Sequence, residues 1–305
     1  MAEPTAFFCG RWLPVAQLAI PYSDAGFVLG ATVTEQLRTF GGTPFRLDDH
    51  IGRLARSLEI AHIDVGRHSD ELAEIVREAA RRNHRLLAEG DDLGVGVFVT
   101  PGPYATFAPA APQVPTLGVY TYPLPFALWV DAYREGVELV VSDIRQVPRQ
   151  TLPPELKCRS RMHYYLADRR AEAMRPGARA VLLDDQGFVT ETSTANLIMV
   201  RRDEGLISPP LADILPGISL MTARQLADRI SVPFVERKIR PAELPLADEI
   251  ILTGTSLCAV AAVGCDGRRI GDGVPGPVYR ALLHAWSDLV GVDINAQAAR
   301  FTDRA

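Results

Sequence analysis

The order of short strands and helices is the feature that most constrains this fold. The segment AFFCGRWLPV turns at Gly10 and VTEQLRTFGGTPFRL breaks at Gly41-Gly42, so each predicts a β-hairpin. Two helices are expected next, one over LDDHIGRLARSLEIAHI with Asp48 or Asp49 as its cap, and one over residues 69–88. Two further strands, LGVGVFVT and TLGVYTYPL, follow. Neighbouring strands that pair as hairpins, with helices to one side, indicate an α+β fold.

The proline-rich stretch YPLPFALWVDAYREG predicts a domain boundary. We therefore expect an N-terminal α+β domain over residues 1–122, an interdomain linker over 123–134 and a C-terminal domain over 135–305. In the second domain we expect the strand VELVVSDI, a strand-turn-strand over ARAVLLDDQGFVTETSTANLIMV, and a helix that starts at Ile218. Another strand-turn-strand, EIILTGTSLCAVAAVGCDG, precedes a C-terminal helix near residues 278–289.

Charge and composition exclude several classes of function. The net charge of -5 and a pI near 5.7 argue against a nucleic-acid binder. No apolar run approaches the ~18 residues of a membrane span, and the N-terminus does not resemble a secretory signal. The four cysteines show no CxxC spacing, which favours a reduced, cytoplasmic protein without a zinc site. The six histidines are dispersed, so no metal site is expected, and motifs such as GxSxG, HExxH and GxxxxGK[ST] are missing.

Lysine is nearly absent from this chain, with two lysines against thirty arginines. One of them, Lys157, lies in PPELKCRSRMHYYLADRRAEA directly after a Pro-Pro turn. Where a site needs only positive charge, Arg can replace Lys, but only a primary amine can form a Schiff base. Lys157 is therefore a candidate nucleophile, whereas Lys238 has no such setting and is expected at the surface.

Three other segments suit a phosphorylated, electron-withdrawing cofactor. LPGIS, residues 215–219, places Gly and Ser at a helix start, where backbone N–H groups bind phosphate. TGTS, residues 253–256, is a turn rich in hydroxyls, and Glu191 in VTETSTAN could meet a pyridine nitrogen. Each feature alone has an ordinary explanation: a surface lysine, a helix cap, a plain turn or a solvated strand residue. Their order along the chain favours the cofactor.

Together these segments resemble the class IV (fold type IV) pyridoxal-phosphate enzymes, which include branched-chain and D-amino-acid aminotransferases and aminodeoxychorismate lyase. The similarity extends over DAGFVLGATVTEQLRTFGGTPFRLDDHIGRLARSLEI, LKCRSRMHYYLA, VTETSTANL, ILPGIS and TGTS. It implies a two-domain α+β fold with a smaller N-terminal α/β sandwich and a larger C-terminal pseudo-barrel that binds pyridoxal 5'-phosphate. It also implies an aminotransferase that works through a Lys157 aldimine with an amino donor and a 2-oxo acid, as a homodimer.

The resemblance carries roles to individual positions. Lys157 matches the catalytic lysine, and Glu191 matches the acid at the pyridine nitrogen. The other matched positions are the phosphate-binding Arg53, the ring-packing Leu215, the phosphate-binding helix start Ile218 and Ser219, the second phosphate contact Thr255, and Gly254 and Ser256 towards a substrate carboxylate.

The match is weaker on the substrate side. Branched-chain members usually have tyrosines where this chain has Leu29 and Met162, and a Tyr-x-Arg on the strand that reads LGVGVFV here. Arg38, Arg159 or Arg161 could supply an anion site instead, or the donor could be an amine. We expect a branched-chain-like aminotransferase, with a D-amino-acid or (R)-amine transaminase, an aminodeoxychorismate-type lyase, and a non-catalytic protein on this fold as alternatives.

Overall fold

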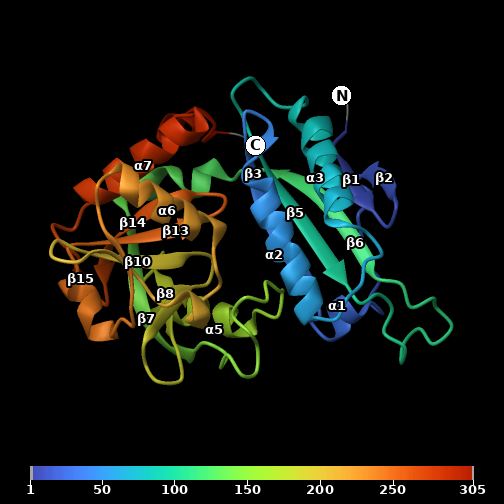
Figure 1. The fold of residues 1–305 in the computed structure, drawn as a ribbon, viewed down its shortest axis with the longest axis horizontal. Helices are drawn as coiled ribbons and strands as arrows, with labels where there is room; N and C mark the ends of the chain where they lie inside the picture. Colours follow the sequence, from blue (N-terminus) through green and yellow to red (C-terminus); the bar gives the residue numbers. More distant parts are fainter. Residues whose placement is uncertain (1–2, 304–305) are drawn as a thin grey trace. The chain divides into compact units, whose positions relative to one another are not determined.

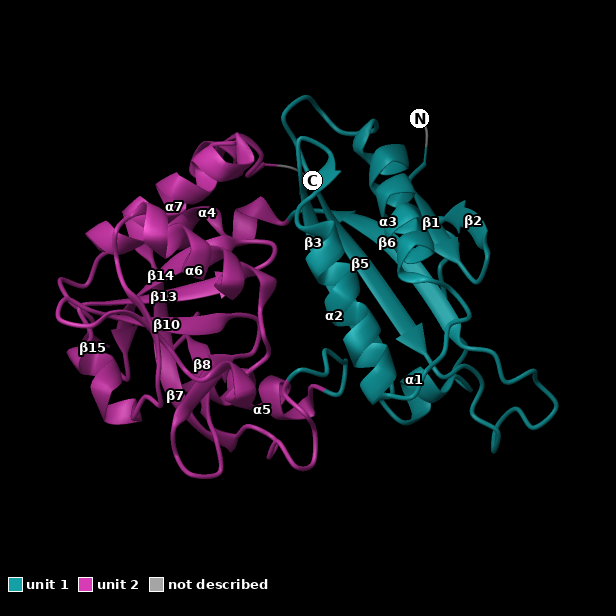
Figure 2. Ribbon diagram, viewed as in Figure 1, with its two compact units in different colours: residues 1–124, 155–160 teal, residues 125–154, 161–305 magenta. Residues whose placement is uncertain are grey.

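The computed structural model describes residues 3–303, which form two compact units (Figure 2). Unit 1 contains the chain up to Leu124 together with Glu155–Ser160. Unit 2 contains Pro125–Pro154 and the chain from Arg161 onward. The sequence predicts a linker over residues 123–134. In the structure, η2 (Phe126–Leu128) lies in this stretch, and the linker itself stays a prediction.

In the described chain, unit 1 is built on a six-stranded sheet with the order β2-β1-β6-β5-β3-β4 (Figure 1). Its pairings are antiparallel, as the hairpin signals predict. The elements are β1 (Thr5–Phe8), β2 (Arg11–Pro14), α1 (Ala25–Val28), β3 (Val33–Phe40), β4 (Thr43–Pro44), α2 (Leu47–Ile60), α3 (Ser69–His84), β5 (Leu93–Thr100) and β6 (Thr116–Pro123).

Helices α2 and α3 cover one face of this sheet (Figure 1). Side chains of a strand alternate between its two faces, so every second residue of β3, β5 and β6 points to the helices. Leu37 and Val97 meet Leu54 and Val76 there, and all four are at most 1% exposed. Burial of each such side chain stabilises the folded chain by roughly 1.5–3 kcal/mol. This core holds α2, and therefore Arg53 on it, against β3.

The two predicted hairpins are confirmed, but the predicted cap of α2 is wrong. Gly41 and Gly42 both have positive φ, 56° and 79°, as a tight two-residue turn requires. The N-cap of α2 is Arg46, with φ 50° and no side-chain capping bond. Asp48 and Asp49 lie inside the first turn, where their charge favours the positive end of the helix dipole.

The other face of the sheet carries glycines beneath aromatic rings. Gly94 pairs directly with Tyr122, and Gly96 pairs with Tyr120. A Cβ at Gly94 would lie 2.1 Å from the Tyr122 ring, and one at Gly96 would lie 2.4 Å from that of Tyr120. The Nε2 of Gln36 on β3 donates to the Tyr122 hydroxyl. The glycines of LGVGVFV thus make room for the tyrosines of the next strand.

As far as residue 303, unit 2 contains a nine-stranded sheet that closes on itself. Strands β10, β13, β14, β7, β8 and β9 are neighbours in that order, and β9 returns to β10 through the pair Glu191 and Asn196. The elements are α4 (Val130–Glu135), β7 (Val137–Arg145), α5 (Met162–Met174), β8 (Arg179–Leu183), β9 (Val189–Thr192), β10 (Asn196–Arg201), β11 (Gly205–Ser208), α6 (Ile218–Arg229), β12 (Phe234–Glu236), β13 (Glu249–Gly254), β14 (Cys258–Cys265), β15 (Arg268–Arg269), α7 (Pro277–Val290) and α8 (Ile294–Arg300). The predicted α+β fold, with one separate sheet and one barrel-like sheet, is confirmed.

Two sequence expectations for unit 2 need correction. The predicted strand-turn-strand over residues 178–200 is three strands, β8, β9 and β10, because a tight turn at Ser193–Ala195 separates β9 from β10. The last helix is α8 rather than α7, since Gly291 ends α7 with φ 68° and the side chain of Asp293 caps α8. In the described residues, no helix is long and apolar enough to cross a membrane.

Candidate active site

Glu191, Asn196 and Thr253 lie side by side on three neighbouring strands of unit 2. Glu191 pairs with Asn196, and Asn196 pairs with Thr253. Directly paired residues in antiparallel strands point to the same face, so these polar side chains form a row. All three are buried, and the Thr253 hydroxyl has no hydrogen-bond partner among residues 3–303. A bound ligand would supply the hydrogen-bond partner that this buried hydroxyl lacks.

The carboxylate of Glu191 accepts hydrogen bonds from three side chains of other elements. The Tyr164 hydroxyl on α5 donates to Oε1 over 2.7 Å, and Nε2 of Gln146, just after β7, donates to the same oxygen over 3.2 Å. Nδ2 of Asn196 donates to Oε2 over 2.9 Å. Three donors from different elements therefore hold this carboxylate in one orientation. The sequence predicts Glu191 but not Tyr164 or Gln146.

The N-terminus of α6 lies beside this row. Nδ2 of Asn196 also donates to the carbonyl oxygen of Leu215 over 2.9 Å, which ties the approach to α6 to Glu191. A Cβ on Gly217 would lie 1.9 Å from Oδ1 of Asn196, so only glycine fits there without movement. No side chain caps α6, and Ile218 and Ser219 begin it in buried positions. An uncapped helix start with a neighbouring hydroxyl suits a phosphate.

The turn between β13 and β14 contains Gly254, Thr255 and Ser256, all half-buried. The end of the turn next to β14 is held by the Tyr133 hydroxyl, which donates to the carbonyl oxygen of Leu257 over 2.8 Å. The turn follows directly after Thr253, the last member of the polar row. Unit 2 thus contains every predicted site residue from Glu191 onward: Glu191, Leu215, Ile218, Ser219, Gly254, Thr255 and Ser256.

Lys157 belongs to unit 1, although the chain on both sides of Glu155–Ser160 belongs to unit 2. Its segment lies beside β3 and pairs with it through one isolated antiparallel bridge, with Val33 opposite Cys158. The backbone N–H of Thr34 donates to the Lys157 carbonyl oxygen over 2.9 Å, and the Lys157 N–H donates to Ser57 Oγ over 3.1 Å. Lys157 is half-buried and its backbone is fixed on two sides.

Arg53, on α2, is held by a buried carboxylate on β3. Its Nε lies 2.9 Å from Oε2 of Glu35 and its Nη2 lies 2.7 Å from Oε1, a bidentate pair. Glu35 is fully buried. Burial alone would raise the pKa of Glu35, but the charge of Arg53 and its two hydrogen bonds, with His50 close by, hold it well below the usual range. The sequence analysis identifies Arg53 but not Glu35, the carboxylate that holds it.

His50 completes this cluster as a neutral side chain. Its Nδ1 lies 3.1 Å from Oε1 of Glu35, but the angle is poor for a hydrogen bond, so the contact is chiefly electrostatic. Burial lowers the pKa of His50, and the charges of Arg53 and Lys157 lower it further against the opposing effect of Glu35. The sequence expects a locally bonded histidine here, and the structure places it 1% exposed against β3.

The expected substrate residues Leu29 and Arg38 are both in unit 1. Leu29 follows α1 and is 59% exposed. Arg38 on β3 is 1% exposed, with its guanidinium 4.1 Å from the centre of the Phe40 ring. In unit 2, Nη2 of Arg161 donates to the Ser193 carbonyl, and its guanidinium lies 4.5 Å from the centre of the Tyr164 ring. A role of these residues in substrate binding stays a prediction.

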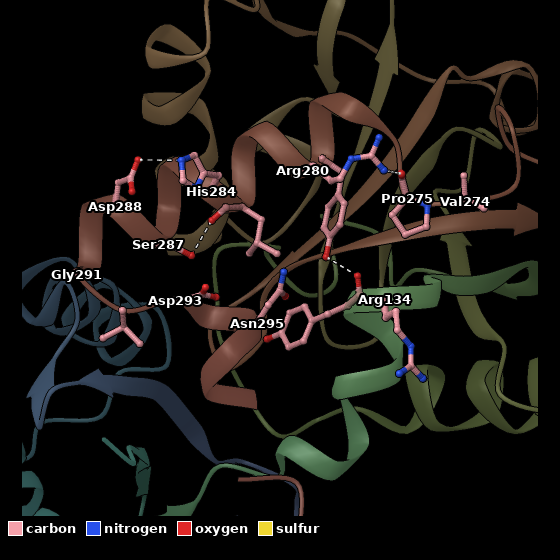
Figure 3. A pocket seen from close by; sticks show the side chains of 14 residues that line it. Arg134, Val274, Pro275, Arg280, His284, Ser287, Asp288, Gly291, Asp293 and Asn295 are labelled. Carbon is pink, nitrogen blue, oxygen red and sulfur yellow. Dashed lines mark hydrogen bonds and ion pairs between the residues drawn. The ribbon is translucent and has the colours of Figure 1, made fainter. Parts of the chain in front are cut away.

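A separate cavity of about 840 Å³ lies in unit 2 (Figure 3). It is lined from α4, α7 and the chain leading into α8, and its charged groups include Arg134, Arg280 and the ion pair of His284 with Asp288 at 3.7 Å. None of the predicted site residues lines it. In the described part of the chain, no group of three or more His, Cys, Asp or Glu side chains could hold a metal ion.

Comparison with known proteins identifies the family of this chain. The family model "Amino-transferase class IV" matches residues 32–263, a span that includes Arg53, Lys157, Glu191, Ser219 and Thr255. The chain belongs to the class IV aminotransferases. It is therefore an enzyme of that family, as the sequence resemblance implies.

Two curated relatives and one solved structure illustrate the similarity. The D-alanine aminotransferase of Bacillus licheniformis is 28% identical over 278 residues, 90% of this chain and 92% of that protein. The branched-chain-amino-acid aminotransferase of Salmonella typhimurium is 29% identical over 274 residues, 85% of this chain and 84% of that protein. The branched-chain aminotransferase of Thermoproteus uzoniensis, solved with norvaline, has a TM-score of 0.83 and 26% identity, covering 95% of this chain and 96% of that one.

Proposed function

We propose that this class IV aminotransferase uses pyridoxal 5'-phosphate to move an amino group between an amino acid and a 2-oxo acid. The observation that carries the proposal is the setting of Glu191. Its carboxylate is fixed by three donors at the point where the sheet of unit 2 closes, and Asn196 links it to the start of α6. A fixed acid suits the ring nitrogen of this cofactor, and an uncapped helix start beside it suits the phosphate. The buried Thr253 hydroxyl, which has no hydrogen-bond partner among residues 3–303, also fits a bound group.

The roles of the side chains follow from their chemistry. When bound, the cofactor withdraws electrons from the substrate carbon that loses its proton. Glu191 would hold a proton on the ring nitrogen. Ser219, Thr255 and the N–H groups at the start of α6 would bind the phosphate, for which Arg53 is a further proposed contact, and Leu215 would pack on the ring. Lys157 would hold the cofactor through Nζ and act as the base for the proton of the substrate carbon.

For the substrate we propose an amino acid with an apolar side chain, as in branched-chain enzymes. The similarity to the Salmonella typhimurium and Thermoproteus uzoniensis enzymes supports this choice. A D-amino acid is the second candidate, because the Bacillus licheniformis D-alanine aminotransferase is about as similar. The strand LGVGVFV lacks the Tyr-x-Arg of branched-chain members, which keeps this second candidate in the test. The family match and these relatives do not favour the lyase alternative.

Two measurements test the proposal. Borohydride treatment of the purified protein should fix the cofactor to Lys157, which peptide mass spectrometry detects, and Lys157→Ala should abolish the labelled peptide. If the label remains in Lys157→Ala, the lysine assignment is wrong. Half-reactions with L- and D-amino acids and (R)-amines, followed by absorbance, then separate the substrates. Turnover of D-amino acids alone would reject the branched-chain assignment, and pyruvate release from aminodeoxychorismate would reject the aminotransferase chemistry.

We also propose that the enzyme is a cytoplasmic homodimer. The family resemblance supports the dimer, and the sparse cysteines, which form no disulfide among the described residues, support a reducing compartment. Light scattering of the purified enzyme tests the dimer: a molar mass near the 33.3 kDa of one chain would contradict it.

A further inference from the structure

Tyr164 and Gln146 form a closed hydrogen-bonded triangle with Glu191. Nε2 of Gln146 lies 2.6 Å from the Tyr164 hydroxyl, which lies 2.7 Å from Oε1 of Glu191, and Nε2 lies 3.2 Å from the same oxygen. The three residues come from α5, the end of β7 and β9, so the triangle joins three separate elements. Such a contact is part of the tertiary packing and cannot form locally in the chain.

The direction of these hydrogen bonds is fixed by chemistry. Tyr164 is buried, and burial together with the negative charge of Glu191 raises its pKa well above the usual value, so the phenol keeps its proton and donates it to the carboxylate. The amide of Gln146 then points both of its N–H bonds at oxygens, while its Oε1 has no partner among residues 3–303. The reverse orientation would set Oε1 against the Glu191 carboxylate, which is repulsive. The orphaned oxygen shows that the amide is oriented by Glu191.

The helical spacing of residues in α5 explains why Tyr164, and not Tyr165, joins this hydrogen-bonded triangle. Tyr164, Ala167 and Ala171 recur at helical spacing and pack against β7 and β8. Tyr165, one residue later, points away and is 61% exposed. The guanidinium of Arg161 lies 4.5 Å from the Tyr164 ring, which holds that ring in place and makes its hydroxyl a stronger donor.

We propose that Tyr164 is a positioning residue that, with Gln146, lowers the basicity of Glu191 and so keeps the shared proton on the nitrogen of the cofactor ring. This inference rests on the proposed function, in which Glu191 meets that nitrogen. A carboxylate that accepts additional hydrogen bonds binds a proton less tightly. The proton between Glu191 and the ring then stays on the ring, where it strengthens electron withdrawal. Tyr164 touches neither substrate nor reacting atoms in this role.

The test follows the ring nitrogen directly, in enzyme loaded with 15N-labelled pyridoxal 5'-phosphate. We expect the 15N shift of the wild type to be that of a protonated ring. Tyr164→Phe removes one charge-assisted hydrogen bond, which changes the proton distribution by about tenfold or more, and moves the shift towards the unprotonated value. Gln146→Leu removes a longer bond and moves it less in the same direction. Tyr165→Phe, the same change one residue along, leaves the shift unchanged.

A double substitution distinguishes action through Glu191 from direct contact with the cofactor. Glu191→Gln alone lowers the pH at which the ring nitrogen loses its proton, which 15N spectra across a pH series follow, and adding Tyr164→Phe changes that pH no further if Tyr164 acts through Glu191. An equal additional shift in that background would overturn the inference, as would an unchanged shift in both Tyr164→Phe and Gln146→Leu. If Glu191→Gln itself leaves the shift unchanged, the assignment of Glu191 to the ring nitrogen falls, and the inference falls with it.

Discussion

The substitution Glu35→Gln should destabilise unit 1 strongly at neutral pH. Gln has the shape of Glu but no charge, and its N–H₂ group would face an N–H group of Arg53 at one of the two contacts, which are now 2.7 and 2.9 Å long. Glu35 is fully buried, so the guanidinium would lose its counter-charge where water cannot replace it. Removing one partner of a buried ion pair typically costs about 3–5 kcal/mol in the free energy of unfolding. We expect a loss in this range.

The loss should depend on pH in a defined direction. The pKa of Glu35 is lowered in the folded chain, so its ionised form stabilises folding above the unfolded pKa, near 4.5, and this contribution disappears as pH falls through the lower folded pKa. The difference between wild type and Glu35→Gln is therefore full from pH 7 to about 5 and shrinks in more acidic solution. His50 also has a lowered pKa, so protonating it below about pH 6.5 disfavours the folded state of both proteins.

Hydrogen exchange of the β3 and α2 amides, followed by mass spectrometry, reports the opening free energy of unit 1 separately from unit 2. Glu59→Gln is the matched control. It makes the same chemical change on α2, where Glu59 is exposed and pairs with Arg56 at 2.8 Å, and we expect no measurable effect. A loss for Glu35→Gln below about 1 kcal/mol, or a difference from wild type that persists unchanged at pH 3, would refute the reasoning.

Three smaller substitutions test other contacts. Gly217→Ala should weaken cofactor binding about tenfold in an absorbance titration, because the new Cβ would push Asn196 away from its hydrogen bonds to Glu191 and Leu215. An unchanged affinity would contradict the close packing of Gly217 against Asn196. Gly52→Ala, in an open position on α2, should instead stabilise the chain by about 0.5–1 kcal/mol in urea unfolding. Tyr133→Phe removes the hydrogen bond to the Leu257 carbonyl and should cost about 0.5–1.5 kcal/mol in urea unfolding. Because Leu257 follows the turn at residues 254–256, which we propose to face the substrate, this change should raise KM more than it lowers kcat. Equal changes in both constants would argue against this.

The sequence predicts the parts of this fold that depend on local rules. Glycine at a tight turn and alternating side chains are decided by residues close in the chain, and so the hairpins at Gly10 and Gly41-Gly42 are confirmed. The cap of α2 was predicted wrongly because an aspartate in the first turn and an aspartate at the N-cap have the same local signature. The break between β9 and β10 was missed because it depends on a tight turn inside an otherwise strand-like segment.

Some residues of the candidate site can likewise be predicted from local sequence, and others cannot. Lys157 and Glu191 occur in recognisable segments, whereas Glu35 and Tyr164 act through contacts with distant elements. The sequence does contain some indication that Glu35 and Tyr164 are buried. Glu35 is the one charged residue on the side of β3 that also carries Val33 and Leu37, and so it faces the helices. Tyr164 shares a helical stripe with alanines. These patterns indicate burial, but only the folded chain identifies the partner.

The assignment of Glu155–Ser160 to unit 1 has a consequence for synthesis at the ribosome. The first half of β3 pairs on one edge with β5 and on the other with the segment that carries Lys157. While only the first 124 residues have emerged, that second edge has no strand beside it and can pair with another chain. The edge is covered about thirty-five residues later, when part of unit 2 has already been made. Unit 1 therefore completes its sheet and receives its lysine in the same late step, so a truncated N-terminal fragment would be both inactive and prone to aggregate.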